Sequence, residues 1–378
     1  MKLKNSVLII LAILAESCYQ KDQSIIEIDS CNAKIVEIPA LSDWTGCKYS
    51  DFATAVDYIP LEITPSSLVG NVNELQITDN GEIIVFDKSQ KHIMRFASDG
   101  KYMNSIGEIG RGPNELIDPY HIAYDSFHNQ LLVWDNAKSE IYFFTLDGKT
   151  TKHIKTGTAY STMGAVDQNH YCVYSNFQEK RNRNKEHYNY QVFDNDGNLK
   201  YKCEKFNADI SFIPDCSDVF QSYNGHLYGK SPHSNIIYEF KSDSIVPLFA
   251  LKYKGLEEWN MEHGHQHNHK DACKKALLSD NYLICKIGDN TNEGLTILNI
   301  KNEKMYCAFN LENDLESFGN SMYNPQCING NKLYGQVNGF QFLVEWMENI
   351  NVNNHPKYEV NKRFAQYENP ILQVLTLK

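Results

Sequence analysis

Short apolar runs, each ended by polar or turn-forming residues, recur along most of the chain at a nearly constant spacing. Three of them end at Phe96, Phe144 and Phe193, which lie 48 and 49 residues apart, and each is followed by an Asp-Gly pair. A fourth run ends at Phe240, 47 residues further on. Asp-Gly is typical of a tight hairpin turn, because glycine accepts a positive φ angle. A fixed period of this length predicts one structural unit that is repeated.

A second set of apolar runs, each with a bulky residue near its end, has the same period. The six runs are Ile83–Phe86, Leu131–Trp134, Tyr171–Tyr174, His226–Tyr228, Tyr282–Cys285 and Lys332–Tyr334. We expect a further strand after each of them, at His92–Phe96, Glu140–Phe144, Asn189–Phe193, Asn235–Phe240, Gly294–Leu298 and Phe340–Trp346. From Phe86 to Tyr334 there are 248 residues over five intervals, or about 50 per unit.

A unit of this length fits four strands of about five or six residues and their turns, and helical periodicity is weak throughout. We therefore predict an all-β protein, a six-bladed β-propeller of four-stranded antiparallel blades. One blade cannot bury both of its apolar faces by itself. Packing the blades in a ring buries these faces against one another and leaves only short edges.

The ring must also be closed, and two isolated apolar segments are available for this. Tyr58–Ile63 precedes the first unit and Ile371–Leu377 follows the last one. We expect one of them to supply the outer strand of blade six, which would tie the two chain ends together. Pro60 favours an edge position for the first segment, because proline has no backbone N–H to donate to a neighbouring strand.

The N-terminus has the pattern of a secretory signal. Lys2 and Lys4 precede an uncharged apolar run from Val7 to Ala15, which is too short for a bilayer that needs about 20 residues. The end of this run resembles the lipobox of bacterial lipoproteins, although Ala15 and Glu16 depart from its usual residues. The resemblance implies that Cys18 is lipidated, and a plain cleaved signal is the alternative. We therefore expect a signal at 1–17, a tether and N-terminal arm at 18–50, and one propeller domain at 51–378.

Composition and charge narrow the function. Hydrophobic residues make up 42% of the chain and aromatic residues 12%, which suits a folded, strand-rich protein. The formal net charge of −11 would repel a phosphate backbone, so nucleic acid is excluded as a partner.

The chain has ten cysteines, which raises the question of disulfides in a protein with a secretory signal. Cys172 and Cys285 lie inside apolar runs, which favours buried free thiols. A bridge between Cys31 and Cys47 in the N-terminal arm is the alternative for that pair.

A glycine-rich segment at Ile106–Leu116 looks like the signature of NHL-type propellers. The whole layout more closely resembles a family of six-bladed propeller lipoproteins from Gram-negative gut anaerobes. The resemblance rests on Leu61-Glu62, on Gly110–Glu115 and on Asn369-Pro370 at the start of the final strand. It implies the fold and a lipid-anchored location at the outer membrane, facing either side. It implies no particular biochemical activity.

Four alternating histidines, His263, His265, His267 and His269, fall between the fourth and fifth units. Alternating imidazoles can present two or three nitrogens to a divalent transition metal such as Zn²⁺, Ni²⁺ or Cu²⁺. The alternative is a solvated loop whose histidines take up protons in mildly acidic solution.

Arg111, Glu115, Tyr120 and His121 form a second candidate site. Loops that link an outer strand to the next inner strand gather on the face where the central channel opens, and ligands usually enter there. An arginine on a glycine-rich turn can pair with a carboxylate or sulfate. The alternative is that the turn only shapes the junction between two blades.

Motifs of hydrolases are missing from the chain: there is no Gly-x-Ser-x-Gly, no His-Glu-x-x-His and no phosphate-binding loop. The leading hypothesis is a monomeric, non-catalytic binding module of the cell envelope. It would hold a glycan, a peptide or an envelope protein at the channel face and touch the membrane only through its lipid anchor. The alternative is a metal-assisted lyase or hydrolase of the NHL type.

Overall fold

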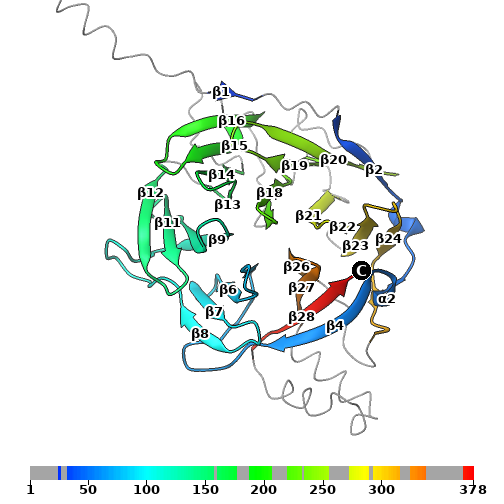
Figure 1. The fold of residues 1–378 in the computed structure, drawn as a ribbon, viewed down its shortest axis with the longest axis horizontal. Helices are drawn as coiled ribbons and strands as arrows, with labels where there is room; N and C mark the ends of the chain where they lie inside the picture. The colour runs from blue at the N-terminus through cyan, green and yellow to red at the C-terminus, as the bar shows by residue number, and fades with distance from the viewer. Residues whose placement is uncertain are drawn as a thin grey trace, which may run out of the picture.

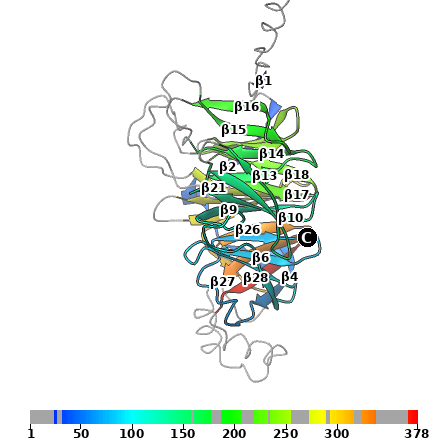
Figure 2. The ribbon, with the colours of Figure 1, turned by 90° about the vertical axis from the view of Figure 1, so that its left-hand side faces the viewer.

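The structure, a computed structural model, describes residues 24–26, 32–156, 160–176, 187–206, 219–231, 234–254, 272–288, 293–315, 324–337 and 369–378. Six antiparallel blades stand around a common axis (Figure 1). Seen from the side, the ring is a flattened disc (Figure 2). The predicted all-β, six-bladed propeller is therefore confirmed.

The chain passes through the blades in order, from the centre of the ring outward in blades 1 to 5. Blade 1 contains β5 (Glu74–Ile77), β6 (Ile83–Asp87), β7 (His92–Phe96) and β8 (Tyr102–Ser105). Blade 2 contains β9 (Pro119–Asp125), β10 (Gln130–Asp135), β11 (Glu140–Thr145) and β12 (Thr150–Lys155). Blade 3 contains β13 (Thr162–Ala165), β14 (His170–Tyr174), β15 (His187–Asp194) and β16 (Leu199–Phe206).

The second half of the ring continues the same order. Blade 4 contains β17 (Phe220–Tyr223), β18 (His226–Gly229), β19 (Ile236–Phe240) and β20 (Ile245–Tyr253). Blade 5 contains β21 (Ala272–Leu278), β22 (Tyr282–Gly288), β23 (Glu293–Asn299) and β24 (Met305–Ala308). Blade 6 contains β26 (Asn324–Asn329), β27 (Lys332–Val337), β28 (Ile371–Leu377) and β4 (Ala53–Pro60). Each of the six apolar runs of the second set forms the second strand of its blade, counted from the centre of the ring.

Blade 6 closes the ring with both ends of the chain. β4 is its outer strand, as predicted for one terminal strand, and it pairs antiparallel with β28 from Pro60 to Ala53. The third strand is β28, so the prediction of a third strand at Phe340–Trp346 is wrong; those residues lie outside the described part of the chain. The reason is burial: β28 is buried at nearly every position, as a strand with neighbours on both sides must be, whereas β4 is partly exposed.

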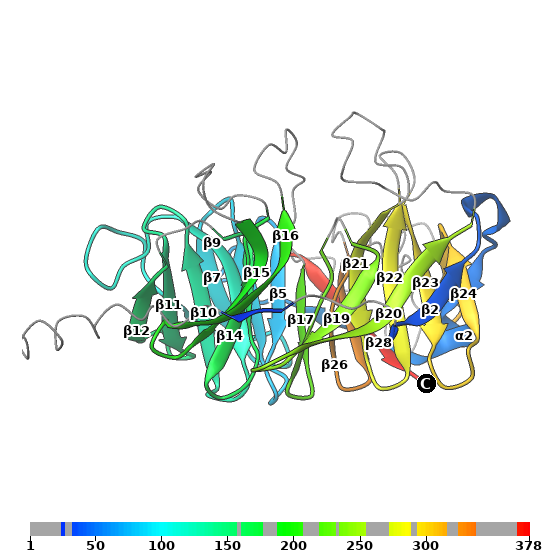
Figure 3. The same cartoon turned by 90° about the horizontal axis from the view of Figure 1, so that it is seen from above.

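An N-terminal arm, residues 24–26 and 32–52, runs along the outside of blades 3, 4 and 5 (Figure 3). In it, β1 (Ser24–Ile25) pairs in parallel with β16, and β2 (Lys34–Ile38) pairs in parallel with β20. β3 (Cys47–Lys48) pairs with β25 (Leu311–Glu312) beside blade 5, and the short helix α2 (Tyr49–Phe52) leads into β4. The arm therefore adds backbone pairing at the outer rim of blades 3, 4 and 5.

The core consists of apolar side chains packed between neighbouring blades, and the second strands contribute most to it. Every residue of β6 is buried, for example. Cys172 and Cys285 are buried free thiols, as predicted. Cys47 is also a free, buried thiol, so the bridge that was considered between Cys31 and Cys47 is not formed.

The Asp-Gly turns have a second role besides turning the chain. Gly100 has a φ of +87°, and a Cβ atom there would lie 2.0 Å from the carbonyl oxygen of Pro60 in the outer strand of blade 6. Gly148 has a φ of +92°, and its Cβ would lie 2.9 Å from the carbonyl oxygen of Ser105 in blade 1. Each turn therefore packs against the preceding blade so closely that only glycine fits.

Candidate functional site

One cavity lies at the centre of the ring, where the inner strands β5, β9, β13, β17, β21 and β26 meet. Its volume is about 60 Å³. Its polar side chains come from five of the six blades and include Glu74, Gln76, His121, Gln221, Lys275 and Gln326. Because polar groups from distant parts of the chain converge here at the centre of the ring, the cavity is the candidate binding site.

The inner strand of each blade is an edge strand whose free backbone groups face the channel, and side chains from the preceding blade pair with some of them. Glu74 in blade 1 accepts a hydrogen bond from the backbone N–H of Ile122 in blade 2, at 2.8 Å. His121 in blade 2 contacts the carbonyl oxygen of Met163 in blade 3 through Nε2, at 3.2 Å. These contacts join consecutive blades and supply partners for edge groups that would otherwise lack them.

Two glutamines do the same on the other side of the ring. Gln221 in blade 4 donates to the carbonyl oxygen of Leu278 in blade 5 at 2.8 Å and accepts from its N–H at 2.6 Å. Gln326 in blade 6 donates through Nε2 to the carbonyl oxygen of Val72, which precedes blade 1, at 3.0 Å. The polar side chains around the cavity therefore have a structural role. A ligand can bind only to those polar atoms that do not already join two blades.

Glu74 is the centre of a buried ion network. Its Oε1 lies 2.8 Å from Lys88 Nζ and its Oε2 lies 3.0 Å from His121 Nδ1. Burial by itself would raise the pKa of Glu74, but the charges and hydrogen bonds of His121 and Lys88 outweigh it, so the pKa is lowered. His121 Nε2 faces a carbonyl, which can only accept, so Nε2 carries a proton.

The structure separates the four residues of the second predicted site. His121 lines the cavity, whereas Arg111 and Glu115 do not. Tyr120 lies next to His121, and its ring is covered by Lys88, whose Nζ is 4.7 Å from the ring centroid. Only His121 of this set therefore belongs to the central cavity.

Glu115 serves its own loop. Its Oε2 accepts a hydrogen bond from the N–H of Gly112 at 2.6 Å. A Cβ atom on Gly110 would lie 1.9 Å from the same oxygen, which explains why the segment carries glycine there. The loop is also closed by hydrogen bonds between Gly110 and Leu116 and between Leu116 and Glu108. The alternative role, shaping the junction between blades 1 and 2, accounts for Glu115.

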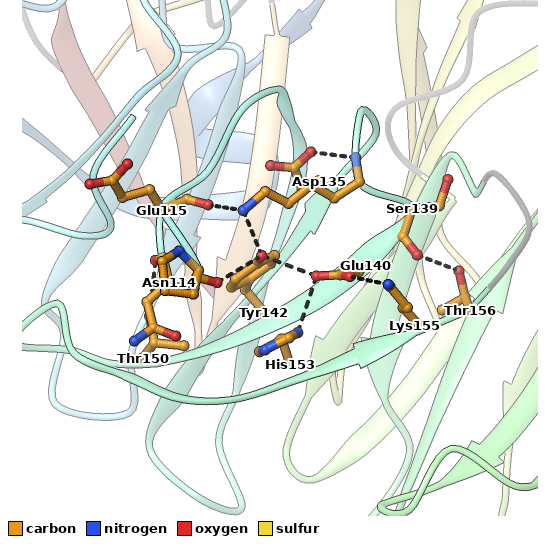
Figure 4. Close-up of polar contacts among 12 residues, drawn as sticks. Asn114, Glu115, Asp135, Ser139, Glu140, Tyr142, Thr150, His153, Lys155 and Thr156 are labelled. Carbon is orange, nitrogen blue, oxygen red and sulfur yellow. Dashed lines mark hydrogen bonds and ion pairs between the residues drawn. The ribbon is translucent and has the colours of Figure 1, made fainter. Parts of the chain in front are cut away.

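Side chains of blade 2 contact this loop (Figure 4). Lys138 donates to the carbonyl oxygen of Glu115 and, at 2.9 Å, to the hydroxyl of Tyr142. The Tyr142 hydroxyl donates to Glu140 at 3.0 Å, and Glu140 lies 3.1 Å from His153 Nδ1. The three donor positions of Lys138 are used, because it also donates to the carbonyl oxygen of Gly112. Several hydrogen bonds therefore hold the loop although it lies at the surface.

Arg111 is exposed at the tip of this loop and has no polar side-chain partner within the part of the chain that the structure describes. The four histidines from His263 to His269, and Cys18, lie outside the described residues. Among the residues that are described, no group of three or more His, Cys, Asp or Glu side chains is placed to hold a metal ion. No helix there is long and apolar enough to cross a membrane.

Sequence reasoning missed most of the cavity residues, including Glu74, Gln221 and Gln326. They lie in inner strands as short as four residues, whose polar residues interrupt the apolar pattern. A usable sign was present: a polar residue within a short apolar run shortly before each second strand, as in Glu74-Leu-Gln-Ile. It does not say that these positions meet at one point, since that depends on the closed ring.

Residues 33–376 match the model of the family described as "Domain of unknown function (DUF4934)", and the chain belongs to this family. No curated protein matches it. A crystal structure of a "Putative exported protein" from Bacteroides fragilis is similar, with a TM-score of 0.72 and 14% identity over 91% of this chain and 100% of that one. A member of the duf4221 family from Bacteroides vulgatus aligns with a TM-score of 0.50 and 12% identity, covering 86% and 97%. At these identities the likeness shows the fold alone.

Proposed function

We propose that this protein is a binding module that holds a glycan, peptide or protein partner at the end of the channel where the inner strands begin. The observation that carries the proposal is the central cavity, in which polar side chains from different blades converge. His121 and Gln326 line the site, and Arg111 on the glycine-rich loop is the proposed contact for the outer part of the partner. No observation on the described residues favours the alternative of a lyase or hydrolase.

The cavity can be closed by a single substitution with a matched control. Ser222 is exposed and lines the cavity, so Ser222→Trp should fill it while Ser222→Ala leaves it open. A soluble form that begins at residue 19, and so lacks the predicted signal and Cys18, would be applied to glycan and peptide arrays. We expect a saturable ligand for the unaltered chain and for Ser222→Ala, and its loss in Ser222→Trp. A ligand that Ser222→Trp retains at full affinity would contradict a site in the channel.

We further propose that the protein is exported and anchored to the outer membrane through a lipid on Cys18. The support is the N-terminal pattern of two lysines, a short apolar run and a cysteine. Cys18→Ser should abolish incorporation of labelled palmitate and release the protein into the soluble fraction, whereas Cys47→Ser should change neither. Membrane association that survives Cys18→Ser would exclude this anchor.

The metal site predicted at His263, His265, His267 and His269 also stays a proposal. Elemental analysis of the purified protein should show a bound divalent transition metal that is lost when the four histidines are replaced by alanine. Metal that remains bound after this replacement would place the site elsewhere.

A further inference from the structure

The described part of the N-terminal arm begins at the outer rim of blade 3, close in sequence to the proposed anchor. Five residues separate Cys18 from Ser24, the first residue of β1. A chain spans at most about 3.6 Å per residue, so Ser24 can lie no more than about 22 Å from Cys18. β1 pairs with β16, the outer strand of blade 3. A lipid on Cys18 therefore brings the outer rim of blade 3 close to the membrane.

This rim is rich in lysine, in contrast to the chain as a whole. Four strands form it: β16 and β20, the outer strands of blades 3 and 4, and the arm strands β1 and β2 that pair with them (Figure 1). Together these strands contain two glutamates and five lysines, which are Lys34, Lys200, Lys202, Lys205 and Lys252. All of these lysines are exposed except Lys202, which is half-buried. The whole chain, with 36 basic and 47 acidic residues, has the opposite balance.

The acidic groups at this rim offset only part of its charge. Oε2 of Glu204 is buried rather than exposed. Lys34 lies 2.7 Å from Glu303. Lys200 lies 3.4 Å from Asp194. Both ion pairs involve an exposed lysine, and a pair of this kind contributes little in water, so an external anion can compete for the lysine.

Two exposed isoleucines lie among these lysines. Ile25 in β1 is 51% exposed and Ile35 in β2 is 54% exposed. Ile25 is the register partner of Lys202, and register partners on neighbouring strands project to the same face of a sheet. Apolar side chains next to basic ones are typical of a surface that lies on a membrane, because the former enter the headgroup region while the latter contact phosphates.

We propose, on the basis of the lipid anchor proposed above, that this basic rim docks on the anionic phospholipid headgroups of the membrane that holds the anchor. The basic rim consists of the five lysines together with Ile25 and Ile35. Because it belongs to the perimeter of the disc, the ring stands on its edge with its axis along the membrane (Figures 1 and 2). The two ends of the central channel then face sideways, where a partner can reach them.

The first test measures the basic rim without the anchor. The soluble form that begins at residue 19 would be floated with vesicles of phosphatidylcholine alone, or of equal parts of phosphatidylcholine and phosphatidylglycerol. At low ionic strength we expect it to bind the anionic vesicles and not the zwitterionic ones. Added salt should release it, since salt screens the attraction. No binding to the anionic vesicles would overturn the proposal.

A charge-matched pair of double variants locates the contact. Lys200→Glu with Lys205→Glu should weaken binding to anionic vesicles by about 30-fold or more, since each lysine near such a surface strengthens binding about five-fold. The control is Lys101→Glu with Lys149→Glu in the turns of blades 1 and 2, which changes the net charge equally. These two lysine side chains are 75% and 81% exposed, and each lies near an aspartate, as Lys200 does. Equal losses in the two variants would mean that only the total charge matters, and would overturn the basic rim.

The second test needs no substitution and follows the orientation of the full lipidated chain. The chain in anionic vesicles and the soluble form without vesicles would be acetylated briefly, and the modified lysines identified by mass spectrometry. Lys205 and Lys252 should react more slowly in the vesicle sample, whereas Lys101 and Lys149 should react equally in both. Protection of Lys101 or Lys149 instead would place another surface on the membrane and overturn the edge-on orientation.

The outcomes separate this inference from the proposed anchor. Palmitate labelling of Cys18 decides the anchor, whereas flotation of a form that lacks Cys18 tests only the basic rim. Labelling without any binding of the soluble form would keep the anchor and refute the basic rim. Binding that Lys200→Glu with Lys205→Glu abolishes, in a protein that is not labelled, would refute the anchor and keep the basic rim as a lipid-binding surface. Circular dichroism checks that both double variants are folded.

Discussion

Blades 3 to 5 and blades 1 and 2 protect their outer rims differently. Blades 3 to 5, the strapped blades, lie under the N-terminal arm, which pairs with β16 and β20 and covers the side of blade 5. In blades 1 and 2, the bare blades, no added strand pairs with β8 or β12 among the described residues. β8 has only four residues, and β12 carries Lys152 and Lys155. A short edge strand and lysines on an edge strand both prevent pairing with the edge of another chain.

In the bare blades, buried aspartates bind the backbone of neighbouring loops instead. Asp87 ends β6, and its Oδ2 accepts from the N–H groups of Gly70 at 2.8 Å and Asn71 at 3.0 Å. Asp135 ends β10 and holds the N–H of Ile117 in the same way, at 2.6 Å. Both aspartates are fully buried. The equivalent positions in the other blades are Ser175, Gly229, Lys286 and Gly335. A ring of similar blades can thus be stabilised locally by buried carboxylates or from outside by a strap.

The largest expected effect comes from removing one of these carboxylates. Asp87→Ala leaves several backbone N–H groups in the preceding and following loops without their partner, and should lower the free energy of unfolding by about 3–4 kcal/mol. Ser175→Ala, at the equivalent position of blade 3, removes one hydroxyl donor that two acceptors share and should cost about 1 kcal/mol. Urea denaturation measures both. Equal losses would mean that the bare blades do not depend on their aspartates.

Replacing a buried carboxylate in a strapped blade should have the opposite effect and make the protein more stable at pH 8. Glu204 in β16 has a φ of +57°, and its Oε2 is buried without a hydrogen-bond partner. Burial raises the pKa of Glu204 to about 7, although hydrogen bonds from Asn189 and Ser231 and the charge of Lys230 oppose this. The folded state therefore binds the proton more tightly than the unfolded state, whose ordinary pKa is 4.5.

The stability that this proton confers is fully present below about pH 4.5 and is lost progressively as the pH rises to about 7. The loss should reach about 3 kcal/mol in the unaltered protein. In Glu204→Gln this component of the pH dependence should be absent, so the variant is the more stable protein at pH 8. Urea denaturation at pH 5 and pH 8 gives the comparison. Parallel pH profiles for the two proteins would rule out Glu204 as the group responsible.

Weakening the strap should affect only the strapped side. Trp44 in the arm packs against Phe309, with ring centroids 5.0 Å apart, and covers Gly294, where an added Cβ would lie 2.6 Å from its ring. Trp44→Ala should cost about 2 kcal/mol, because the ring is only partly buried. Hydrogen exchange should become faster in β24 while β8 in blade 1 stays unchanged. Faster exchange in both strands would show that the two sides are not independent.

The smallest effect is expected for the clamp of the glycine-rich loop. Lys138→Met removes the ammonium that bonds the Glu115 carbonyl, and should cost about 1 kcal/mol and speed hydrogen exchange at Gly112. Lys155→Met is the matched control, since the Lys155 side chain is 80% exposed and its ion pair with Glu140 is long, at 3.6 Å. If the control loosens the loop as much as Lys138→Met does, the clamp is not specific.

Much of the fold could be predicted because the blade is a local unit. Its second and third strands are apolar runs separated by short turns, and Asp-Gly pairs mark several of these turns. The third strand of blade 6 could not be placed in this way, because β27 and β28 are far apart in the chain. No local sequence pattern indicates that they pair. The parallel pairing of β2 with β20 is hidden for the same reason.

The candidate site was predictable only in part. His121 was singled out from its place at the start of an inner strand, whereas Gln221 and Gln326 carry no motif and gain their meaning from the blades they face. The sequence by itself determined the period, the number of blades and the turns, since these depend on residues within about 50 positions of one another. Only the closed ring decided which edge each polar side chain pairs with, because these contacts join residues up to hundreds of positions apart.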